Sequence, residues 1–363
     1  MKILFLLPGG AGAPVGGVKV VLEYANRLVA DGYEVGVVYP SYCRGLHWIG
    51  IFLYCKAVIR FLAYFLIKRY SCRTWFPLDA RVKEYWVWSL DERWVPKADV
   101  YVATAVQTAY YLTRYKKVSS NLKFYLIQGF EDWGNSNREY LLNSYHFPLH
   151  KFVIANWLRK IIEKENESCT LIPNGFDFSQ FHITIPLEKR KRYKVCMLYH
   201  KSQGKGCADG FKALEIVKRR CSDLRVTLFG VPSRPEGLPE WYEYYQRPSR
   251  EVHTRLYNEA AIFLGTSHSE GWGLTVGEAM ACGCAVVCTD NPGYLEMAED
   301  GKTALVAPVA DYVALANNIL RLMKDDALRV RIAYEGNKNI LRFTWDSSYS
   351  ILREEIEKGL RVS

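Results

Sequence analysis

Short, continuous runs of apolar residues recur through the first half of the chain, with segments of helical spacing between them. Apolar runs of this length are typical of strands buried in a parallel sheet. They predict strands at residues 2–7, 34–39, 99–105, 123–127 and 151–155. A helix is predicted at 18–30, after a glycine-rich turn that contains Gly16 and Gly17. Strand, helix and strand in this order form a βαβ unit, so the first half is predicted to be an α/β domain.

The same alternation begins again in the second half of the chain. Strands are predicted at 195–199, 225–229, 261–265, 285–288 and 304–307, and helices at 208–220, 251–260, 278–282 and 312–323. Pro173 and Gly175 interrupt the pattern between the halves, and such residues suit a joint between domains. The charged run at 188–194 is predicted to be solvent-exposed, and a last helix is predicted after Phe343. At 363 residues, the chain has the length of two domains.

The stretch 268–283 joins two predicted strands and carries the main candidate site. Gly271 and Gly273 allow the backbone to approach a ligand closely, and the helix start that follows offers unpaired N–H groups to an anion. Glu270 and Glu278 flank this site, with seven residues between them. Because amides suit a diphosphate and carboxylates suit hydroxyl groups, the pattern points to a nucleotide sugar.

A purely structural interpretation of the same residues is also open. Thr275 and Glu278 have the spacing of a capping box, in which Thr275 caps the helix and Glu278 reaches back to the cap. Glu270 would then be an ordinary acidic residue of a loop.

Three consecutive blocks of this stretch form a longer motif. They are Ser-x-x-Glu-Gly-Trp-Gly-Leu, then Gly-Glu-Ala-Met-Ala-x-Gly, then Ala-Val-Val. In this order they resemble the signature of the retaining family-four glycosyltransferases. The resemblance implies the GT-B architecture, an α/β fold in which two doubly wound Rossmann-like domains face each other across a cleft. It assigns 1–172 to the acceptor-side domain and 173–345 to the nucleotide-sugar-binding domain, and it implies that a helix at 346–363 crosses back to the first domain.

Similarity to this family implies transfer of a sugar from a nucleotide-diphosphate-sugar donor, with retention at the anomeric carbon. The expected catalytic residues are Glu270 facing the donor sugar, Glu278 on the ribose hydroxyls and Lys205 on the diphosphate. Further donor contacts are expected from Gly271, Trp272, Gly273, Leu274, Thr275, Gly16 and Gly17. These groups would stabilise the leaving diphosphate without a metal ion. No cofactor is expected, because the nucleotide sugar is itself a substrate.

The loop at 199–206 departs from the family pattern at one position. The family has an arginine and a lysine five residues apart, and both bind the diphosphate. Lys205 followed by Gly206 matches the lysine, but His200 stands at the arginine position. A neutral histidine donates one hydrogen bond where a guanidinium presents a planar fork. Either a charged His200 or the adjacent Lys201 is expected to take the place of the arginine.

A second departure lies in the loop that follows the predicted strand 123–127. Many members of the family carry a histidine around this loop, whereas here the position is held by Gln128, with Glu131 and Asp132 nearby. The sequence leaves open whether an acid or a base in the first half replaces that histidine.

Charge and cysteine content limit the expected partners. The formal net charge of +10 and the pI near 9.0 favour an anionic partner, such as a phosphorylated substrate or an anionic membrane. No recognition motif accompanies the basic runs, so nucleic acid is not an expected partner. Ten cysteines occur without paired Cys-x-x-Cys repeats, so no metal site is expected. The first apolar run is too short for a signal peptide, which predicts a cytoplasmic protein.

Residues 48–70 are strongly apolar and aromatic, with basic residues among them. Lys56 and Arg60 lie one helical turn apart, and each would cost about 2.5–3.5 kcal/mol at the centre of a bilayer. The favoured interpretation is a helix in the interface of an anionic membrane, and a helix buried against its domain and a membrane span are the alternatives. A peripheral protein on the inner face of the membrane is therefore predicted. Its acceptor would be a glycan or a lipid-linked sugar in cell-surface polysaccharide or glycoconjugate synthesis.

Two other functional classes are compatible with the pattern. One is another GT-B enzyme of nucleotide sugars or sugar phosphates, such as an epimerase or a phosphorylase. The other is a non-catalytic protein that binds an anionic surface through its basic residues, and such binding would weaken as salt is added.

Overall fold

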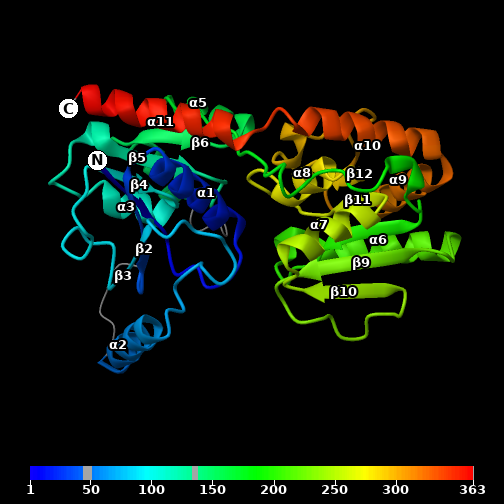
Figure 1. Cartoon of the computed structure of the whole chain (residues 1–363), viewed down its shortest axis with the longest axis horizontal. Helices are drawn as coiled ribbons and strands as arrows, with labels where there is room; N and C mark the ends of the chain where they lie inside the picture. Colours follow the sequence, from blue (N-terminus) through cyan, green and yellow to red (C-terminus); the bar gives the residue numbers. More distant parts are fainter. Residues whose placement is uncertain (44–50, 133–137, 363) are drawn as a thin grey trace. The chain divides into compact units, whose positions relative to one another are not determined.

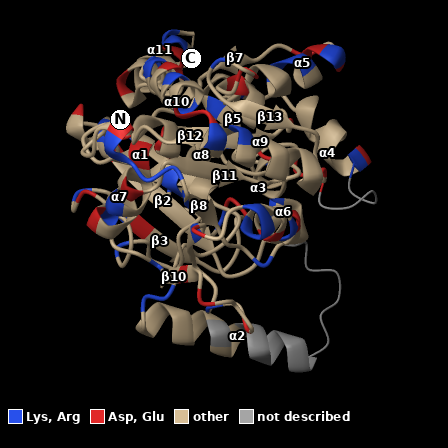
Figure 2. Cartoon of the chain, turned by 90° about the vertical axis from the view of Figure 1, so that its right-hand side faces the viewer, with Lys and Arg blue, Asp and Glu red and all other residues tan. Residues whose placement is uncertain are grey.

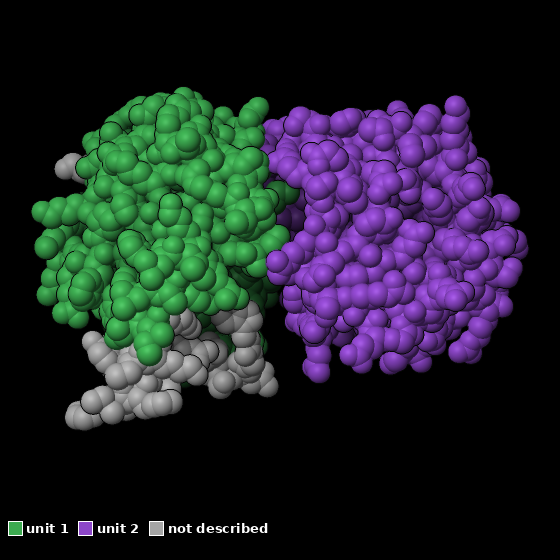
Figure 3. Space-filling model, turned by 60° about the horizontal axis from the view of Figure 1, so that its bottom comes forward, with its two compact units in different colours: residues 1–174, 346–363 green, residues 175–345 purple. Residues whose placement is uncertain are grey.

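The computed structural model describes residues 1–43, 51–132 and 138–362, apart from the side chains of residues 51–57 and 60. The chain forms two compact units, shown in different colours in Figure 3. Unit 1 comprises Met1–Asn174 and Asp346–Ser363, and unit 2 comprises Gly175–Trp345. Each unit is built on one parallel β-sheet with helices, as the alternating pattern predicted.

The sheet of unit 1 has seven parallel strands within the described ranges. In chain order these are β1 (Lys2–Leu6), β2 (Glu34–Pro40), β3 (Lys83–Val87), β4 (Val100–Ala103), β5 (Lys123–Ile127), β6 (His150–Val153) and β7 (Thr170–Leu171). They lie side by side in the order β3-β2-β1-β4-β5-β6-β7, so the strand order reverses between β1 and β4. Ligands of such sheets bind beside a reversal point, at the carboxyl ends of the strands.

The helices of unit 1 connect these strands. They are α1 (Gly16–Ala30), α2 (Ile51–Leu66), α3 (Val106–Leu112), α4 (Arg138–Tyr145), α5 (Asn156–Lys164) and α11 (Trp345–Arg361). The prediction of a turn at Gly16 and Gly17 was wrong, because these glycines form the first turn of α1. The extended backbone of Val15, with φ −137°, precedes that turn as the N-cap.

The last helix, α11, packs on unit 1 (red in Figure 1). Tyr349 donates a hydrogen bond of 2.6 Å to the carboxylate of Asp31, and Arg353 donates one of 2.8 Å to the same oxygen. Tyr33 donates to Glu357 at 2.9 Å. These polar contacts attach the C-terminal residues to the unit that also contains the N-terminus.

Helix α2 has one face against the sheet of unit 1 and another that is exposed. On the inner face, the rings of Phe61 and Tyr64 stack on Trp86 of β3, with centroids 5.9 and 5.7 Å from it. The outer face and the residues that follow it expose the apolar side chains of Ile59, Leu62, Phe65, Leu66 and Ile67. Figure 2 shows the described part of α2 without acidic or basic residues.

Parts of the segment predicted to bind a membrane lie outside the described residues, namely 48–50 and the side chains of Lys56 and Arg60. Exposed Lys68 and Arg69 follow the helix. Within the described ranges, no helix combines the length and the apolar content that crossing a membrane requires.

The sheet of unit 2 has six parallel strands, all within the described part of the chain. They are β8 (Lys194–Leu198), β9 (Arg225–Gly230), β10 (Tyr242–Gln246), β11 (Ile262–Gly265), β12 (Ala285–Thr289) and β13 (Leu305–Ala307). The helices are α6 (Cys207–Arg220), α7 (Arg250–Glu259), α8 (Leu274–Ala281), α9 (Tyr312–Lys324) and α10 (Asp326–Ile340). The strand order is β10-β9-β8-β11-β12-β13, with its reversal between β8 and β11.

Candidate active site

Two loops of unit 2 meet at the reversal point between β8 and β11. One follows β8 and contains Lys205, and the other follows β11 and contains Glu270. The hydroxyl of Thr266 donates to the carbonyl of Lys205 at 2.8 Å, and the amide of His268 donates to the carbonyl of Gly204 at 2.8 Å. His268 Nε2 also lies 2.7 Å from a carboxylate oxygen of Asp209 on α6. The two loops are therefore held together as one structure.

The centre of this structure is an ion pair. Lys205 Nζ lies 2.6 Å from Glu270 Oε1, and the hydroxyl of Ser267 donates to the same oxygen at 2.7 Å. The side chains of Lys205 and Glu270 are 30% and 15% exposed, so solvent reaches both. Sixty-five positions of sequence separate the two residues, and the pairing of β8 with β11 brings their loops together.

Helix α8 begins directly after the glycine loop. Gly273 is its N-cap in a left-handed conformation with φ 101°, and no side chain caps the helix. The capping-box interpretation of Thr275 and Glu278 was therefore wrong, since Thr275 is the second residue of the helix. The predicted helix 278–282 begins four residues earlier, at Leu274. Leu274 and Thr275 are half-buried, and the first amides of a helix have no partner within it, so an anion can accept their hydrogen bonds.

Tyr294 lies beneath the glycine loop and defines its path. A Cβ atom at Gly273 would lie 2.5 Å from the ring of Tyr294, and a Cβ atom at Gly293 would lie 2.4 Å from the carbonyl oxygen of Glu270. Trp272 is buried, with its ring edge-on to Phe343 at 5.1 Å between centroids. In this structure the Trp272 side chain is part of the core, and its backbone belongs to the loop.

Glu278 lies in the second turn of α8 and is only 5% exposed. Its carboxylate accepts a hydrogen bond of 3.4 Å from the hydroxyl of Tyr257, which is itself fully buried. The two glutamates of the motif thus differ in environment, because Glu270 faces a charged side chain at the loop and Glu278 faces a phenol in the interior.

The comparison with protein families matches the unit that contains this site. Residues 180–339 match the model described as glycosyl transferases group 1. The match contains the signature at 268–283. The chain is a glycosyltransferase with the GT-B fold that uses a nucleotide sugar, as that signature predicted.

The chain is similar to curated bacterial glycosyltransferases. The chain is 24% identical over 271 residues to the N,N'-diacetylbacillosaminyl-diphospho-undecaprenol alpha-1,3-N-acetylgalactosaminyltransferase of Campylobacter jejuni, which covers 68% of this chain and 71% of that protein. It is 31% identical over 226 residues to the capsular polysaccharide biosynthesis glycosyltransferase CapM of Staphylococcus aureus, covering 57% of each.

Solved structures share the fold along the length of the chain. Sucrose-phosphate synthase from Thermosynechococcus elongatus aligns with a TM-score of 0.72 at 14% identity and covers 100% of both chains. HepE from Anabaena, in complex with UDP and glucose, aligns with a TM-score of 0.71 at 16% identity and covers 99% of this chain and 100% of its own. At such low identity these similarities establish the GT-B fold alone.

The histidine at the family's arginine position is neutral in the free glycosyltransferase. His200 Nδ1 accepts a hydrogen bond of 3.0 Å from the amide of Ser202, so that nitrogen carries no proton. Burial lowers the pKa of His200, and the positive charge of Lys205 lowers this pKa further, against a smaller opposite effect of Glu270. The two expected substitutes for the arginine were a charged His200 and the adjacent Lys201. In the free protein His200 is neutral, and Lys201 is exposed.

Unit 1 of the glycosyltransferase carries the remaining candidate residues. Gly16 and Gly17 lie at the start of α1, and a Cβ atom at Gly17 would lie 3.4 Å from the side-chain nitrogen Nε2 of Gln128. Glu131, which the sequence marked only as a nearby acid, accepts a hydrogen bond of 2.8 Å from the amide of Val106. Burial raises the pKa of Glu131 to about 7, although this hydrogen bond opposes the shift.

Proposed function

We propose that this glycosyltransferase transfers a sugar from a UDP-sugar, with retention of anomeric configuration, to a glycan or lipid-linked acceptor in cell-surface polysaccharide or glycoconjugate synthesis. The observation that carries the proposal is the position of Lys205 beside Glu270 and the glycine loop that starts α8. Uridine as the base is supported by the UDP complexes of HepE and of TarM, which share this fold. The acceptor class is supported by the names of the Campylobacter and Staphylococcus relatives.

In this proposal, the protein stabilises the leaving group electrostatically. As the glycosidic bond breaks, the UDP diphosphate gains negative charge. The Lys205 ammonium and the first amides of α8, at Leu274 and Thr275, stabilise that charge without a metal ion. Gly271 and Gly273 let the backbone reach the phosphates. Because Lys205 is paired with Glu270 in the free protein, the diphosphate takes over a cation that the carboxylate otherwise holds.

The two glutamates have separate roles in the proposed reaction. Once Lys205 binds the diphosphate, Glu270 orients the donor sugar and stabilises the positive charge that develops on its ring. Glu278 binds the ribose hydroxyls of the nucleotide from its position against Tyr257. In the family's mechanism, the leaving phosphate accepts the proton of the incoming acceptor hydroxyl, and we propose the same route here.

We further propose that the enzyme acts as a peripheral protein on the cytoplasmic face of an anionic membrane. The exposed apolar side chains of α2 would insert among the lipids, and Lys68 and Arg69 would lie at the level of the headgroups. The formal net charge of +10 favours the same surface.

The proposal is tested by mixing the purified enzyme with UDP-, GDP- and dTDP-sugars and a membrane extract that contains lipid-linked glycans. The expected result is that a UDP-sugar releases its nucleoside diphosphate in buffer with EDTA, and that this release depends on the extract. NMR of the product should show the anomeric configuration of the donor. An inverted product would overturn retention, and release that requires a divalent metal would overturn the metal-independent mechanism. Use of GDP- or dTDP-sugars alone would overturn uridine as the base. Isomerisation of the donor without release would indicate the epimerase alternative.

A further inference from the structure

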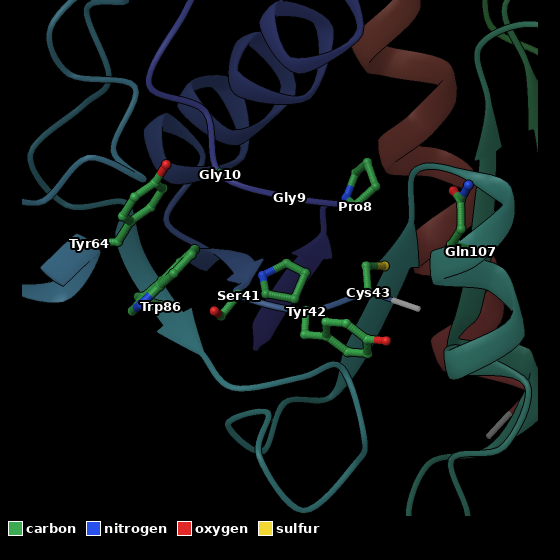
Figure 4. A pocket seen from close by; sticks show the side chains of 10 residues that line it. Pro8, Gly9, Gly10, Ser41, Tyr42, Cys43, Tyr64, Trp86 and Gln107 are labelled. Atoms are coloured by element: carbon green, nitrogen blue, oxygen red, sulfur yellow. The ribbon is translucent and has the colours of Figure 1, made fainter. Parts of the chain in front are cut away.

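Unit 1 contains a cavity of about 450 Å³ at the carboxyl ends of its first strands, and its described lining includes Tyr64, Trp86 and Gln107 (Figure 4). The family resemblance already implies an acceptor site in this unit. The resemblance does not say what holds Glu270 in place at the donor site of unit 2 once Lys205 turns from its carboxylate to a diphosphate. The contacts of that carboxylate identify such a group.

One oxygen of the Glu270 carboxylate has two hydrogen-bond donors. Lys205 Nζ lies 2.6 Å from Oε1, and the hydroxyl of Ser267 donates to the same atom at 2.7 Å. No hydrogen bond to the second oxygen, Oε2, is found within residues 1–43, 51–132 and 138–362. Because the Glu270 side chain is partly exposed, Oε2 can accept a hydrogen bond from a hydroxyl group of a ligand.

The two donors differ in their freedom to move. Lys205 carries its ammonium on a flexible four-carbon stem and is 30% exposed, so it can turn to an anion that enters the site. Ser267 is only 2% exposed, and its hydroxyl is attached directly to Cβ. When an anion takes the lysine, Ser267 remains as the donor to Oε1 among the described residues.

A buried polar network behind Ser267 fixes its position. The carbonyl of Ser267 accepts a hydrogen bond of 2.5 Å from the hydroxyl of Thr289 and one of 2.9 Å from Asn291 Nδ2. Asn291 also donates to Thr289 Oγ1 at 3.1 Å, and its Oδ1 accepts from the amide of Tyr294 at 3.2 Å. Thr289 ends β12, which pairs with β11, so this network attaches Ser267 to the neighbouring strand independently of Lys205.

A purely local role of Ser267 is the alternative. Ser267 and Glu270 have the Ser-x-x-Glu spacing of a capping box, in which the serine would accept a hydrogen bond from a backbone amide at the start of a helix. The following helix begins only at Leu274, and the Ser267 hydroxyl donates to the carboxylate itself. The contact therefore acts directly on the charged group of Glu270.

We propose that Ser267 is the positioning residue for Glu270. Its hydroxyl holds Oε1 both before and after Lys205 moves to the diphosphate, and this keeps Oε2 directed at the donor sugar. The inference rests on the proposed glycosyltransferase reaction and adds to it the group that keeps the carboxylate in place. Without Ser267, the carboxylate loses its remaining partner when the lysine leaves, so binding of the diphosphate becomes less favourable.

A double-mutant cycle on the full chain tests the proposal, with UDP as the probe and calorimetry as the measurement. Ser267→Ala should weaken UDP binding by about three- to tenfold, because Oε1 then has no partner in the complex. In the Glu270→Gln background, the same substitution should leave UDP affinity unchanged, since no carboxylate charge remains to be held. Equal weakening in both backgrounds would indicate a distorted loop and would overturn the proposal.

Turnover of a UDP-sugar is the second measurement. Ser267→Ala should lower kcat by about tenfold or more, because a displaced carboxylate orients the donor sugar poorly. Ser89→Ala is the matched control, since Ser89 is a buried serine of unit 1 whose hydroxyl donates to the carboxylate of Asp91 at 2.6 Å. This control should change neither UDP affinity nor kcat, and thermal unfolding should show that both variants are folded.

The outcomes separate this inference from the proposed function. If the unmodified chain binds UDP and Ser267→Ala changes neither affinity nor kcat, the positioning role is wrong and the proposed donor stands. If the unmodified chain does not bind UDP, the proposed donor fails, and the role of Ser267 fails with it.

Discussion

The ammonium group of Lys205 lies 2.6 Å from a carboxylate oxygen of Glu270, on two loops that leave adjacent strands of unit 2. Both residues were expected at the donor site, but the sequence did not indicate that they bind each other. Their pairing means that a diphosphate competes with Glu270 for the same cation. The pairing also separates two effects of mutation. Removing the lysine removes a phosphate ligand, whereas removing the carboxylate charge frees Lys205 from its ion pair so that it can bind the phosphate.

Lys205→Ala is expected to lower kcat by about 10²- to 10³-fold, because one charged donor to the leaving group is lost. UDP affinity should fall as well, and thermal unfolding should show that the fold persists. Lys302→Ala is the matched control, since Lys302 forms an exposed ion pair with Glu299 in the same unit. Near-normal turnover in Lys205→Ala would contradict the phosphate role.

Glu270→Gln is expected to separate binding from turnover. The neutral amide no longer holds Lys205 as an ion pair, so the affinity for UDP should be unchanged or several-fold higher. Turnover should fall by about 10²-fold, because the carboxylate that faces the donor sugar is lost. Calorimetry with UDP and steady-state kinetics with a UDP-sugar measure the two effects. A parallel loss of UDP affinity and turnover, as in Lys205→Ala, would argue against this role.

His200 predicts a specific dependence of donor affinity on pH. Its pKa is lowered in the free protein by burial and by the charge of Lys205, and a bound diphosphate would offset that charge and raise the pKa again. Binding should therefore take up a proton. The affinity for UDP-glucose should rise about three- to tenfold as the pH falls from about 7.5 to about 5.5.

Calorimetry in two buffers of different ionisation enthalpy would measure this proton uptake directly. His200→Gln, which keeps a neutral hydrogen-bonding side chain, is the control and should show a flat profile over the same range. An identical pH profile in the two proteins would assign the effect to another group.

Gly273→Ala tests the backbone at the start of α8. A left-handed φ of 101° costs a non-glycine residue about 1–2 kcal/mol, and the new Cβ atom would lie 2.5 Å from the Tyr294 ring. With the cost of overpacking added, unfolding free energy should fall by about 2–4 kcal/mol, measured by urea denaturation. Gly204→Ala is the control, because its Cβ atom would meet only Ser202 Oγ at 3.8 Å. Equal stability of the two variants would mean that the loop relaxes freely.

The exposed face of α2 predicts binding to anionic vesicles. Leu66 is 77% and Phe65 is 56% exposed, and burying such side chains among lipids is worth about 1.5–3 kcal/mol each. The double variant Phe65→Ser/Leu66→Ser should therefore bind phosphatidylglycerol vesicles at least about tenfold more weakly in a sedimentation assay. Leu295→Ser changes an exposed leucine of unit 2 and should have no effect. Strong binding to purely zwitterionic vesicles, or none to anionic ones, would contradict the proposal.

The strands that the sequence missed explain the limits of the hydrophobic pattern. β3, β7 and β10 were missed, and each lies at an edge of a sheet. β3 and β10 carry several polar side chains, in Lys83–Val87 and Tyr242–Gln246, and β7 is only the two half-buried residues Thr170–Leu171. An edge strand is partly exposed, so it lacks the continuous apolar run that identified the buried strands β1 and β5. The pattern found the strands whose faces are both covered.

One residue of a charged run can be buried when carbonyl groups of the folded chain replace its water. Arg190 belongs to the segment predicted to be solvent-exposed, but it is only 5% exposed. Its guanidinium donates to the carbonyl oxygens of Cys282 at 2.6 Å and of Ile185 at 2.9 Å. The prediction holds for Glu188, Lys189, Lys191 and Arg192, which are exposed. It was wrong for Arg190, because Cys282 lies 92 positions away and only the folded structure brings its carbonyl to the guanidinium.

The sequence alone determined the alternation of strands and helices, the glycine loop before α8 and the acidic and basic residues around it. These features depend on local physics, namely the burial period of a strand, the freedom of glycine and the orphan amides of a helix start. Only the tertiary structure decided that Lys205 pairs with Glu270, that Glu278 lies against Tyr257, and that a cavity forms beside Trp86. Each of these depends on strands that pair across long stretches of sequence, and such pairing is set by the packing of the sheet as a whole.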